Sequence, residues 1–225
     1  MEQIIAANLD LLVVTSSVKN PKFNAKVIDR LIVTGESSNI DVAIVINKTD
    51  LGLTSDIIAL ADIYKEIGYE VIFTSKVTGE GIETIKEILS NKTSLIWGQS
   101  GVGKSSLLNI LYPHLSLRIG DISGSTSKGT HTTVTSVILP INEDTFVIDT
   151  PGIREIDPYG IREEDLGHYF KEFSEFINNC KFNTCTHNHE PGCAIVEAVE
   201  NGDVAIERYE SYLAILQTIE DDMNF

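Results

Sequence analysis

Hydrophobic residues follow two alternating periodicities along this chain of 225 residues. Five short apolar runs have the length and composition of buried strands: residues 10–16, 41–47, 69–75, 93–97 and 145–149. Helical spacing predicts helices between several of them, at residues 23–38, 55–67, 82–89 and 104–112. This alternation predicts an α/β fold with a mainly parallel sheet and helices on both faces.

The pattern changes after residue 152. Two short helical stretches precede a cluster of Cys and His, and residues 203–222 have near-helical spacing with Asp203 as the expected N-cap. Nine of the fourteen residues from 123 to 136 are Ser or Thr, which predicts a loop between elements rather than a linker. We therefore predict one domain at residues 1–157 and a small helical domain at residues 158–225.

Composition narrows the class of protein. Hydrophobic residues make up 42% and charged residues 22%, which is typical of a soluble globular chain. No apolar run approaches the roughly 18 residues of a membrane span, and the N-terminus does not resemble a secretory signal. These features predict a cytoplasmic protein without a membrane partner. The net charge of -16 is opposite in sign to that of nonspecific nucleic-acid binders and indicates a solvated acidic surface.

Residues 98–105 match the phosphate-binding motif G-x-x-x-x-G-K-[ST], between an expected strand and an expected helix. The glycines let backbone N–H groups turn toward phosphate oxygens, and the following helix directs its positive end at the same anions. We expect Lys104 to contact the β- and γ-phosphates and Ser105 to bind Mg²⁺. The rest of the loop consists of Gly98, Gln99, Ser100, Gly101, Val102 and Gly103.

Asn47, Lys48, Thr49 and Asp50 follow an expected strand and match N-K-x-D. Asp50 can accept hydrogen bonds from the ring N–H and the amino group of guanine, a donor pair that adenine lacks. Asn47 can bind the guanine edge and brace the loop, and the stem of Lys48 can lie over the base. Alone, the motif also fits a helix N-cap at Asp50. Together with a phosphate loop it favours GTP over ATP, because an unpaired carboxylate rejects the wrong base.

Thr74, Ser75 and Lys76 end the next expected strand. Their backbone N–H groups could reach the carbonyl oxygen of the base, although these residues alone are equally typical of a simple turn. The base-reading motif precedes the phosphate loop here. That order is the reverse of the one in common small GTP-binding proteins.

Asp149 and Gly152 lie at the end of the last expected strand, in the sequence D-T-P-G. We expect Asp149 to hold Mg²⁺ through a water molecule and the Gly152 N–H to sense the γ-phosphate, although the same four residues also form common turns. In the Ser/Thr-rich loop, Thr132 or Thr133 would supply a second Mg²⁺ ligand in the GTP state.

Ile153 follows Gly152, where well-known GTPases place a Gln that orients the attacking water. Isoleucine cannot orient water, so another group or a partner must complete the site. His131 is one candidate, and a solvated loop histidine is the alternative interpretation. This predicts slow intrinsic turnover that a partner raises.

All three cysteines lie in one segment, where Cys180, Cys185, His187 and Cys193 form the spacing C-x4-C-x-H-x5-C. Three thiolates and one imidazole make a closed tetrahedral Zn²⁺ site without a position for water, so the metal is expected to be structural. His189 is a competing ligand. An odd number of cysteines in a reducing compartment makes disulfides a poor alternative.

Together these motifs resemble the RsgA family of bacterial ribosome-assembly GTPases. The segments that carry the resemblance are IAANLD, NKTDL, GQSGVGKSSLLN, GTHTT, DTPGIRE, CTHNHEPGCAI and RYESYL. It implies a P-loop GTPase domain with circularly permuted motifs, followed by a zinc-binding domain. It also implies that residues 47–50 and 98–106, Ser106 included, bind GTP or GDP, and that the Cys and His residues bind zinc. The implied role is late maturation of the small ribosomal subunit, whose binding stimulates the enzyme.

One departure concerns RNA. Family members usually carry an N-terminal OB-fold domain that contacts ribosomal RNA, and an expected first strand near Asp10 leaves no room for one. The chain is then either a divergent short member of the family or a chain from which the OB-fold domain is omitted. Contact with the rRNA is less well supported than GTP hydrolysis, and we expect the protein to be a monomer. The alternatives are a GTP-controlled binding module that recruits a protein through its zinc segment, and an ATP-using P-loop kinase, which the base-reading motif disfavours.

Overall fold

The computed structural model describes residues 8–117, 137–149 and 160–223. The chain divides into two units. The first comprises Met1–Asn24 and Ile40–Glu155, and the second comprises Ala25–Asn39 and Ile156–Phe225. Each unit has its own hydrophobic core, and each is described separately below.

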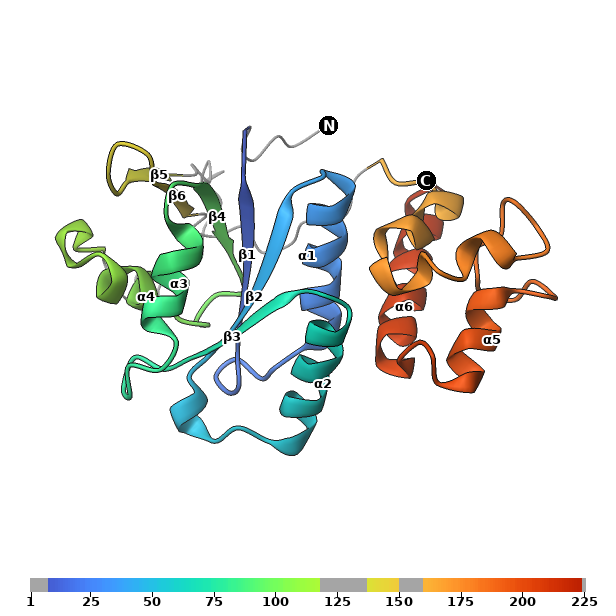
Figure 1. The fold of residues 1–225 in the computed structure, drawn as a ribbon, viewed down its shortest axis with the longest axis horizontal. Coiled ribbons are helices and arrows are strands. Elements are labelled where there is room, and N and C mark those ends of the chain that lie inside the picture. The colour runs from blue at the N-terminus through green and yellow to red at the C-terminus, as the bar shows by residue number, and fades with distance from the viewer. Residues whose placement is uncertain (1–7, 118–136, 150–159, 224–225) are drawn as a thin grey trace, which may run out of the picture. The chain divides into compact units, whose positions relative to one another are not determined.

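Six strands form one sheet in the first unit, in the order β3-β2-β1-β4-β6-β5 (Figure 1). Their bounds are β1 Leu11–Ser17, β2 Asp41–Asn47, β3 Glu70–Thr74, β4 Thr93–Trp97, β5 Val137–Pro140 and β6 Phe146–Asp149. The five expected strands are present and parallel, as predicted. β5 was not predicted, because a four-residue run that ends in proline carries little periodicity; it pairs antiparallel with β6 at the sheet edge.

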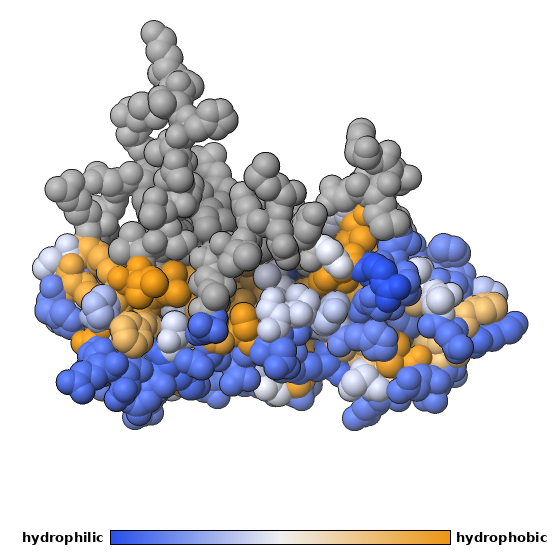
Figure 2. All heavy atoms as spheres, turned by 90° about the horizontal axis from the view of Figure 1, so that it is seen from above, coloured by the Kyte–Doolittle hydropathy of each residue, from blue (hydrophilic) through white to orange (hydrophobic). Residues whose placement is uncertain are grey.

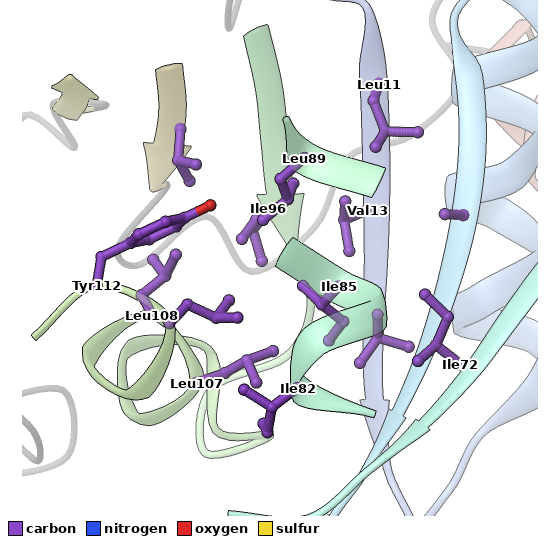
Figure 3. Packing of buried hydrophobic residues seen from close by; sticks show 14 residues of the cluster. Leu11, Val13, Ile72, Ile82, Ile85, Leu89, Ile96, Leu107, Leu108 and Tyr112 are labelled. Carbon is purple, nitrogen blue, oxygen red and sulfur yellow. The ribbon is translucent and has the colours of Figure 1, made fainter. Parts of the chain in front are cut away.

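The described residues of the first unit form three α-helices: α2 (Ser55–Glu66), α3 (Ile82–Leu89) and α4 (Lys104–Leu111). Residues of α3 and α4 pack against alternate residues of the strands, such as Val13 of β1 and Ile96 of β4 (Figure 3). Figure 1 shows α2 on the other side of the sheet. The sheet is therefore covered on both faces, which explains why its central strands are apolar throughout.

The register of the parallel strands brings their carboxyl ends to one edge. Ser17, the last residue of β1, lies opposite Asn47, the last residue of β2, and Asn47 lies opposite Thr74 at the end of β3. The loops that follow these strands therefore emerge side by side. In open α/β sheets this is the edge at which ligands bind.

The second unit contains three α-helices among its described residues: α1 (Ala25–Ser37), α5 (Ala194–Asn201) and α6 (Ile206–Met223). Where two short helical stretches were expected after residue 152, the described residues form three 3₁₀ helices, η3 (Glu163–Tyr169), η4 (Lys171–Phe173) and η5 (Ile177–Asn179). Helix α1 packs against α6 and η3, so it groups with the C-terminal residues although the sequence predicted it within a domain of residues 1–157. Helical periodicity identifies α1 but does not indicate which partner covers its apolar face.

The last helix begins later than predicted. It starts at Ile206, so Asp203 is not its N-cap. Gly202 adopts a left-handed conformation that ends α5, and the N–H groups of Asp203 and Val204 both donate to the carbonyl of Ala198. These residues close the preceding helix instead.

An arginine lies at the centre of the second unit. Arg208 of α6 is 1% exposed and forms ion pairs with Asp29 of α1 and Glu172 of η4, at 2.5 and 2.6 Å. Its guanidinium also lies 4.6 Å from the centroid of the Phe170 ring. Two carboxylates and an aromatic face thus compensate the buried charge and join three segments that are far apart in sequence.

Hydrophilic residues cover most of the described surface on the face shown in Figure 2, and hydrophobic residues occur there in smaller groups. Val77 and Ile138 are the most exposed large hydrophobic residues among those described, at 70% and 62%. None of the described helices combines the length and the apolar character needed to cross a membrane.

We predict that Asp29→Ala destabilises the second unit strongly, since removing one partner of a buried ion pair costs about 3 to 5 kcal/mol. Asp62→Ala is the matched control, because Asp62 pairs with Lys65 at 3.0 Å on the surface, where such a pair contributes less than about 1 kcal/mol. Native-state amide hydrogen exchange measures the loss for each unit separately. Equal effects of the two substitutions would contradict the importance of the Arg208 cluster.

Candidate functional site

The side chain of Asn47 connects the base-reading loop to the phosphate loop. It is buried, and its amide nitrogen donates to the carbonyl of Val102 at 2.9 Å. Its amide oxygen accepts from the hydroxyl of Thr74 at 3.0 Å and from the N–H of Lys48 at 2.8 Å. Asn47 therefore braces three loops at once, which is the bracing role that the sequence suggested for it.

Lys48 extends from the base-reading loop toward the phosphate loop. Its backbone is left-handed, with φ of 63°, and its Nζ donates to the carbonyl of Gly101 at 2.6 Å and to that of Asn20. Burial and the nearby charge of Lys76 lower the pKa of Lys48, while Asp50 acts in the opposite direction. The stem is thus held in place, as expected for a side chain that covers one face of a base.

Asp50 and Ser75 are paired at the same edge. The hydroxyl of Ser75 donates to Oδ1 of Asp50 at 2.6 Å and accepts from the N–H groups of Val77 and Thr78 at 3.1 and 3.3 Å. Asp50 is exposed, so its carboxylate is oriented by Ser75 but accessible to a ligand. The turn after β3 therefore orients the group that would read guanine.

Thr49 and Lys76, the other two residues predicted in these loops, differ in their surroundings. The hydroxyl of Thr49 contacts Oε2 of Glu80 at 2.5 Å, which ties the base-reading loop to the far side of the turn after β3. Lys76 is exposed. Glu80 carried no motif signal in the sequence, because its role depends on the two loops meeting in space.

The phosphate loop follows β4 and leads into α4. Gly98 lies so close to β1 that a Cβ atom would be 2.0 Å from the carbonyl oxygen of Thr15. Gly103 has φ of 106°, and a Cβ there would be 2.4 Å from Nδ2 of Asn47. Only glycine fits these two positions, because the first touches backbone and the second touches the bracing amide.

Lys104 begins α4 and points back into the loop. Its Nζ donates to the carbonyl of Gly98 at 2.6 Å and to that of Gln99 at 3.3 Å, and the residue is 9% exposed. Ser105 and Ser106 lie in the first turn of α4 and are partly exposed. A buried ammonium group at the N-terminus of a helix is suited to bind a phosphate anion.

The predicted residues around the γ-phosphate fall mostly outside the described part of the chain. These are His131, Thr132, Thr133, Gly152 and Ile153. Asp149 is the last residue of β6, and its backbone pairs with Ile96 of β4. Strand β4 is the one that leads into the phosphate loop. The Mg²⁺ ligands and the water-orienting group therefore stay predictions.

Four potential metal ligands come together in the second unit and form a candidate metal site. The ligand atoms of Cys180, Cys185, His187 and Cys193 all lie within 4.8 Å of one another. Nδ1 of His187 lies 3.5 Å from Sγ of both Cys180 and Cys193. His187 is 2% exposed, whereas His189 is exposed and not part of the cluster. The structure thus selects His187 over its competitor, and the set fits tetrahedral zinc.

The chemistry of these thiols also fits a cation. Burial, together with the neighbouring Cys193, raises the pKa of the Cys185 thiol to about 12, and burial raises the pKa of Cys193. Burial lowers the pKa of His187, which keeps the imidazole neutral near pH 7. A divalent cation would convert the thiols to thiolates and release their protons, so zinc would supply the charge that this pocket lacks.

Glu190 fixes the loop that carries His187, a role that the sequence did not indicate. One carboxylate oxygen accepts from the N–H and the hydroxyl of Thr186 at 2.6 and 2.7 Å, and the other accepts from the N–H groups of Asn188 and His189 at 3.1 and 3.2 Å. Burial raises the pKa of Glu190, but these hydrogen bonds outweigh it and lower that pKa to about 2.

Two tyrosines of α6 bind the same loop from outside. The hydroxyl of Tyr209 donates to the carbonyl of His187 at 2.8 Å, and that of Tyr212 donates to the carbonyl of Thr186 at 2.7 Å. The metal loop is therefore attached to the helix at two points, one turn apart. These two hydrogen bonds give the tyrosines of the segment RYESYL a role in holding the metal loop. The apolar periodicity of that segment alone suggested only that it packs.

We predict that Gly103→Ala abolishes nucleotide binding, because its Cβ would displace the amide of Asn47. Gly68→Ala is the matched control: Gly68 also has a positive φ, 100°, but a Cβ there meets nothing within 4 Å. Both variants carry similar backbone strain, so Gly68→Ala shows the cost of strain alone, and the steric contact with Asn47 arises only at Gly103. Titration with a fluorescent GDP derivative measures the effect, and comparable affinity in the two variants would contradict it.

We predict that Glu190→Gln weakens zinc binding about 10- to 100-fold, as removal of residues that orient metal ligands typically does. The amide retains the shape of the carboxylate but places an N–H group where an acceptor is needed. Glu200→Gln, at an exposed position of α5, is the control and leaves the affinity unchanged. Competition with a chromogenic chelator measures the affinity, and an unchanged value for Glu190→Gln would refute the positioning role.

Comparison with known proteins agrees with this geometry. A family model described as RsgA GTPase matches residues 1–159. A small ribosomal subunit biogenesis GTPase RsgA from Chlorobaculum parvum is 42% identical over 98% of this chain and 71% of its own length, and one from Borrelia garinii is 40% identical over 100% and 73%.

Two solved structures have the same fold. The structure of YjeQ from Thermotoga maritima superposes with a TM-score of 0.78 at 38% identity, covering 94% of this chain and 72% of that one. The structure of YloQ, a circularly permuted GTPase, superposes with a TM-score of 0.76 at 33% identity, covering 96% of this chain and 69% of that one. The order of the loops, the contacts between them and these similarities lead to one conclusion: the chain belongs to the RsgA GTPase family.

Proposed function

We propose that this protein binds and hydrolyses GTP as an assembly factor in the maturation of the small ribosomal subunit. The contact between Asn47 and Val102 carries the proposal that the protein binds and hydrolyses GTP, because it joins a guanine-reading loop to a phosphate loop. The role in ribosome assembly is supported by the similar proteins, which are small ribosomal subunit biogenesis GTPases. We place the protein in the cytoplasm, as a monomer that binds the subunit.

The nucleotide would occupy the edge of the sheet where the loops meet. Asp50 would accept from guanine, the stem of Lys48 would cover the base, and backbone N–H groups of residues 74–76 would approach its carbonyl. Residues 98–106 would surround the phosphates. Lys104 would exchange the carbonyls of Gly98 and Gln99 for phosphate oxygens, a stronger interaction because both partners are charged.

Hydrolysis needs groups that we assign from the sequence. We propose that Ser105, Thr132 or Thr133, and, through water, Asp149 hold Mg²⁺. The metal would neutralise the charge that develops on the phosphates. Ile153 cannot orient water, so His131 or a group from the ribosomal subunit would do so, and turnover would be slow without the subunit.

The test compares GTP hydrolysis with and without purified small ribosomal subunits, using Gly103→Ala as the variant that cannot bind nucleotide. We expect the subunit to raise the rate of GTP hydrolysis by roughly tenfold or more in the unmodified protein. We expect no such increase in Gly103→Ala. Co-sedimentation with subunits is expected to be stronger with a non-hydrolysable GTP analogue than with GDP.

Each other outcome has a defined meaning. Association without faster hydrolysis would favour a GTP-controlled binding module with little turnover. Neither association nor stimulation would contradict the ribosomal role. Preferential binding of ATP would overturn the assignment of Asp50 and Asn47 as the base-reading residues.

A further inference from the structure

The loop after β1 contacts the base-reading loop and lies close to the phosphate loop, although no sequence motif marks it. This Asn20 loop, residues 18–21, lies in the first unit. The N–H of Val18 donates to the carbonyl of Asn47 at 3.0 Å, and Nζ of Lys19 donates to the carbonyl of Leu51 at 2.9 Å. Two successive residues therefore bind the first residue of the base-reading motif and the residue that directly follows the motif.

The next two residues reach the lysine of the base-reading motif and the phosphate loop. Nζ of Lys48 donates to the carbonyls of both Asn20 and Gly101. A Cβ atom placed on Gly101 would lie 3.8 Å from Cδ of Pro21 and 3.9 Å from the carbonyl oxygen of Asn20. The ammonium group is thus held between one carbonyl of each loop.

The shape of the Asn20 loop is itself fixed. Ser17, at the buried end of β1, donates its hydroxyl to the carbonyl of Pro21 at 3.0 Å and closes the loop. Asn20 has φ of 53°, a left-handed conformation that Asn tolerates and β-branched residues avoid. The position of the Asn20 carbonyl therefore depends on backbone geometry rather than on the Asn20 side chain.

We propose that the Asn20 loop is a positioning element of the guanine site, which anchors the end of Lys48 so that its stem is in place before the base arrives. This rests on the proposed binding of guanine nucleotide. A lysine side chain loses considerable rotamer freedom when it is ordered, and an anchored one has lost it already. Releasing Nζ would therefore weaken nucleotide binding without altering the groups around the γ-phosphate.

The experiment uses Asn20→Val, which moves the carbonyl, and Asn20→Gly, which permits the same φ. Asn39→Val is the control for strain alone, since Asn39 is exposed and has φ of 54° in the second unit. Loss of one anchoring hydrogen bond corresponds to about a fivefold change in affinity. We expect Asn20→Val to raise the Kd for a fluorescent GDP derivative and the KM for GTP about fivefold, with kcat changed less than twofold.

Asn39→Val is expected to bind like the unmodified protein, and Asn20→Gly, which permits the same φ, is expected to bind more tightly than Asn20→Val. An unchanged Kd for Asn20→Val, or equal weakening by Asn20→Val and Asn20→Gly, would overturn the proposal. Failure of the unmodified protein to bind GDP would instead refute the proposed function. The two failures are therefore distinguishable.

A second pair of variants tests the loop from its other end. Ser17→Ala removes the bond that closes the loop. Ser94→Ala removes an equally buried hydroxyl on β4 that has no hydrogen-bond partner among the described residues. We expect weaker GDP binding only for Ser17→Ala, together with a melting temperature a few degrees lower than that of Ser94→Ala, because only Ser17→Ala loses a buried hydrogen bond. Equal GDP affinities for the two variants would contradict the proposal.

Discussion

The contact between Asn47 and Val102 is the constraint on which the nucleotide site depends. It links residues 55 positions apart and leaves no space beside Gly103 for a side chain. Thr74 fixes the other end of the same amide, so one side chain sets the spacing of three loops. These loops lie together because the parallel register ends β1, β2 and β3 at one edge, which is a property of the backbone and independent of chain order.

The alternation of strands and helices was predictable, because each buried strand is apolar throughout and each helix of the first unit has one apolar face. Motif spacing likewise predicted a phosphate loop, a base-reading loop and the Cys and His residues that the fold brings together. Glu190 and Ser17 could not be identified in this way. Their importance comes from backbone groups that approach them only after folding, and such contacts leave no periodic or compositional signal.

The elements that pack against α1 could not be predicted from the sequence either. Its apolar face fits either a sheet or another helix, and its polar residues look like an ordinary solvated surface. Asp29 is nevertheless buried, since Arg208 supplies a compensating charge from a segment 179 residues away. A charged residue on a helix is usually exposed, so a buried ion pair of this kind misleads any argument from polarity alone.

The division of the chain suggests how the nucleotide could influence the metal-bearing unit. The backbone crosses between the units after Asn24, after Asn39 and after Glu155. The first crossing follows the loop after β1 that contacts Lys48, and the third follows the segment after Asp149 that was predicted to sense the γ-phosphate. Because α1 is tied to α6 by Arg208, both crossings lead into one packed body. The first crossing therefore links the second unit covalently to a loop at the nucleotide edge, on the side of Lys48.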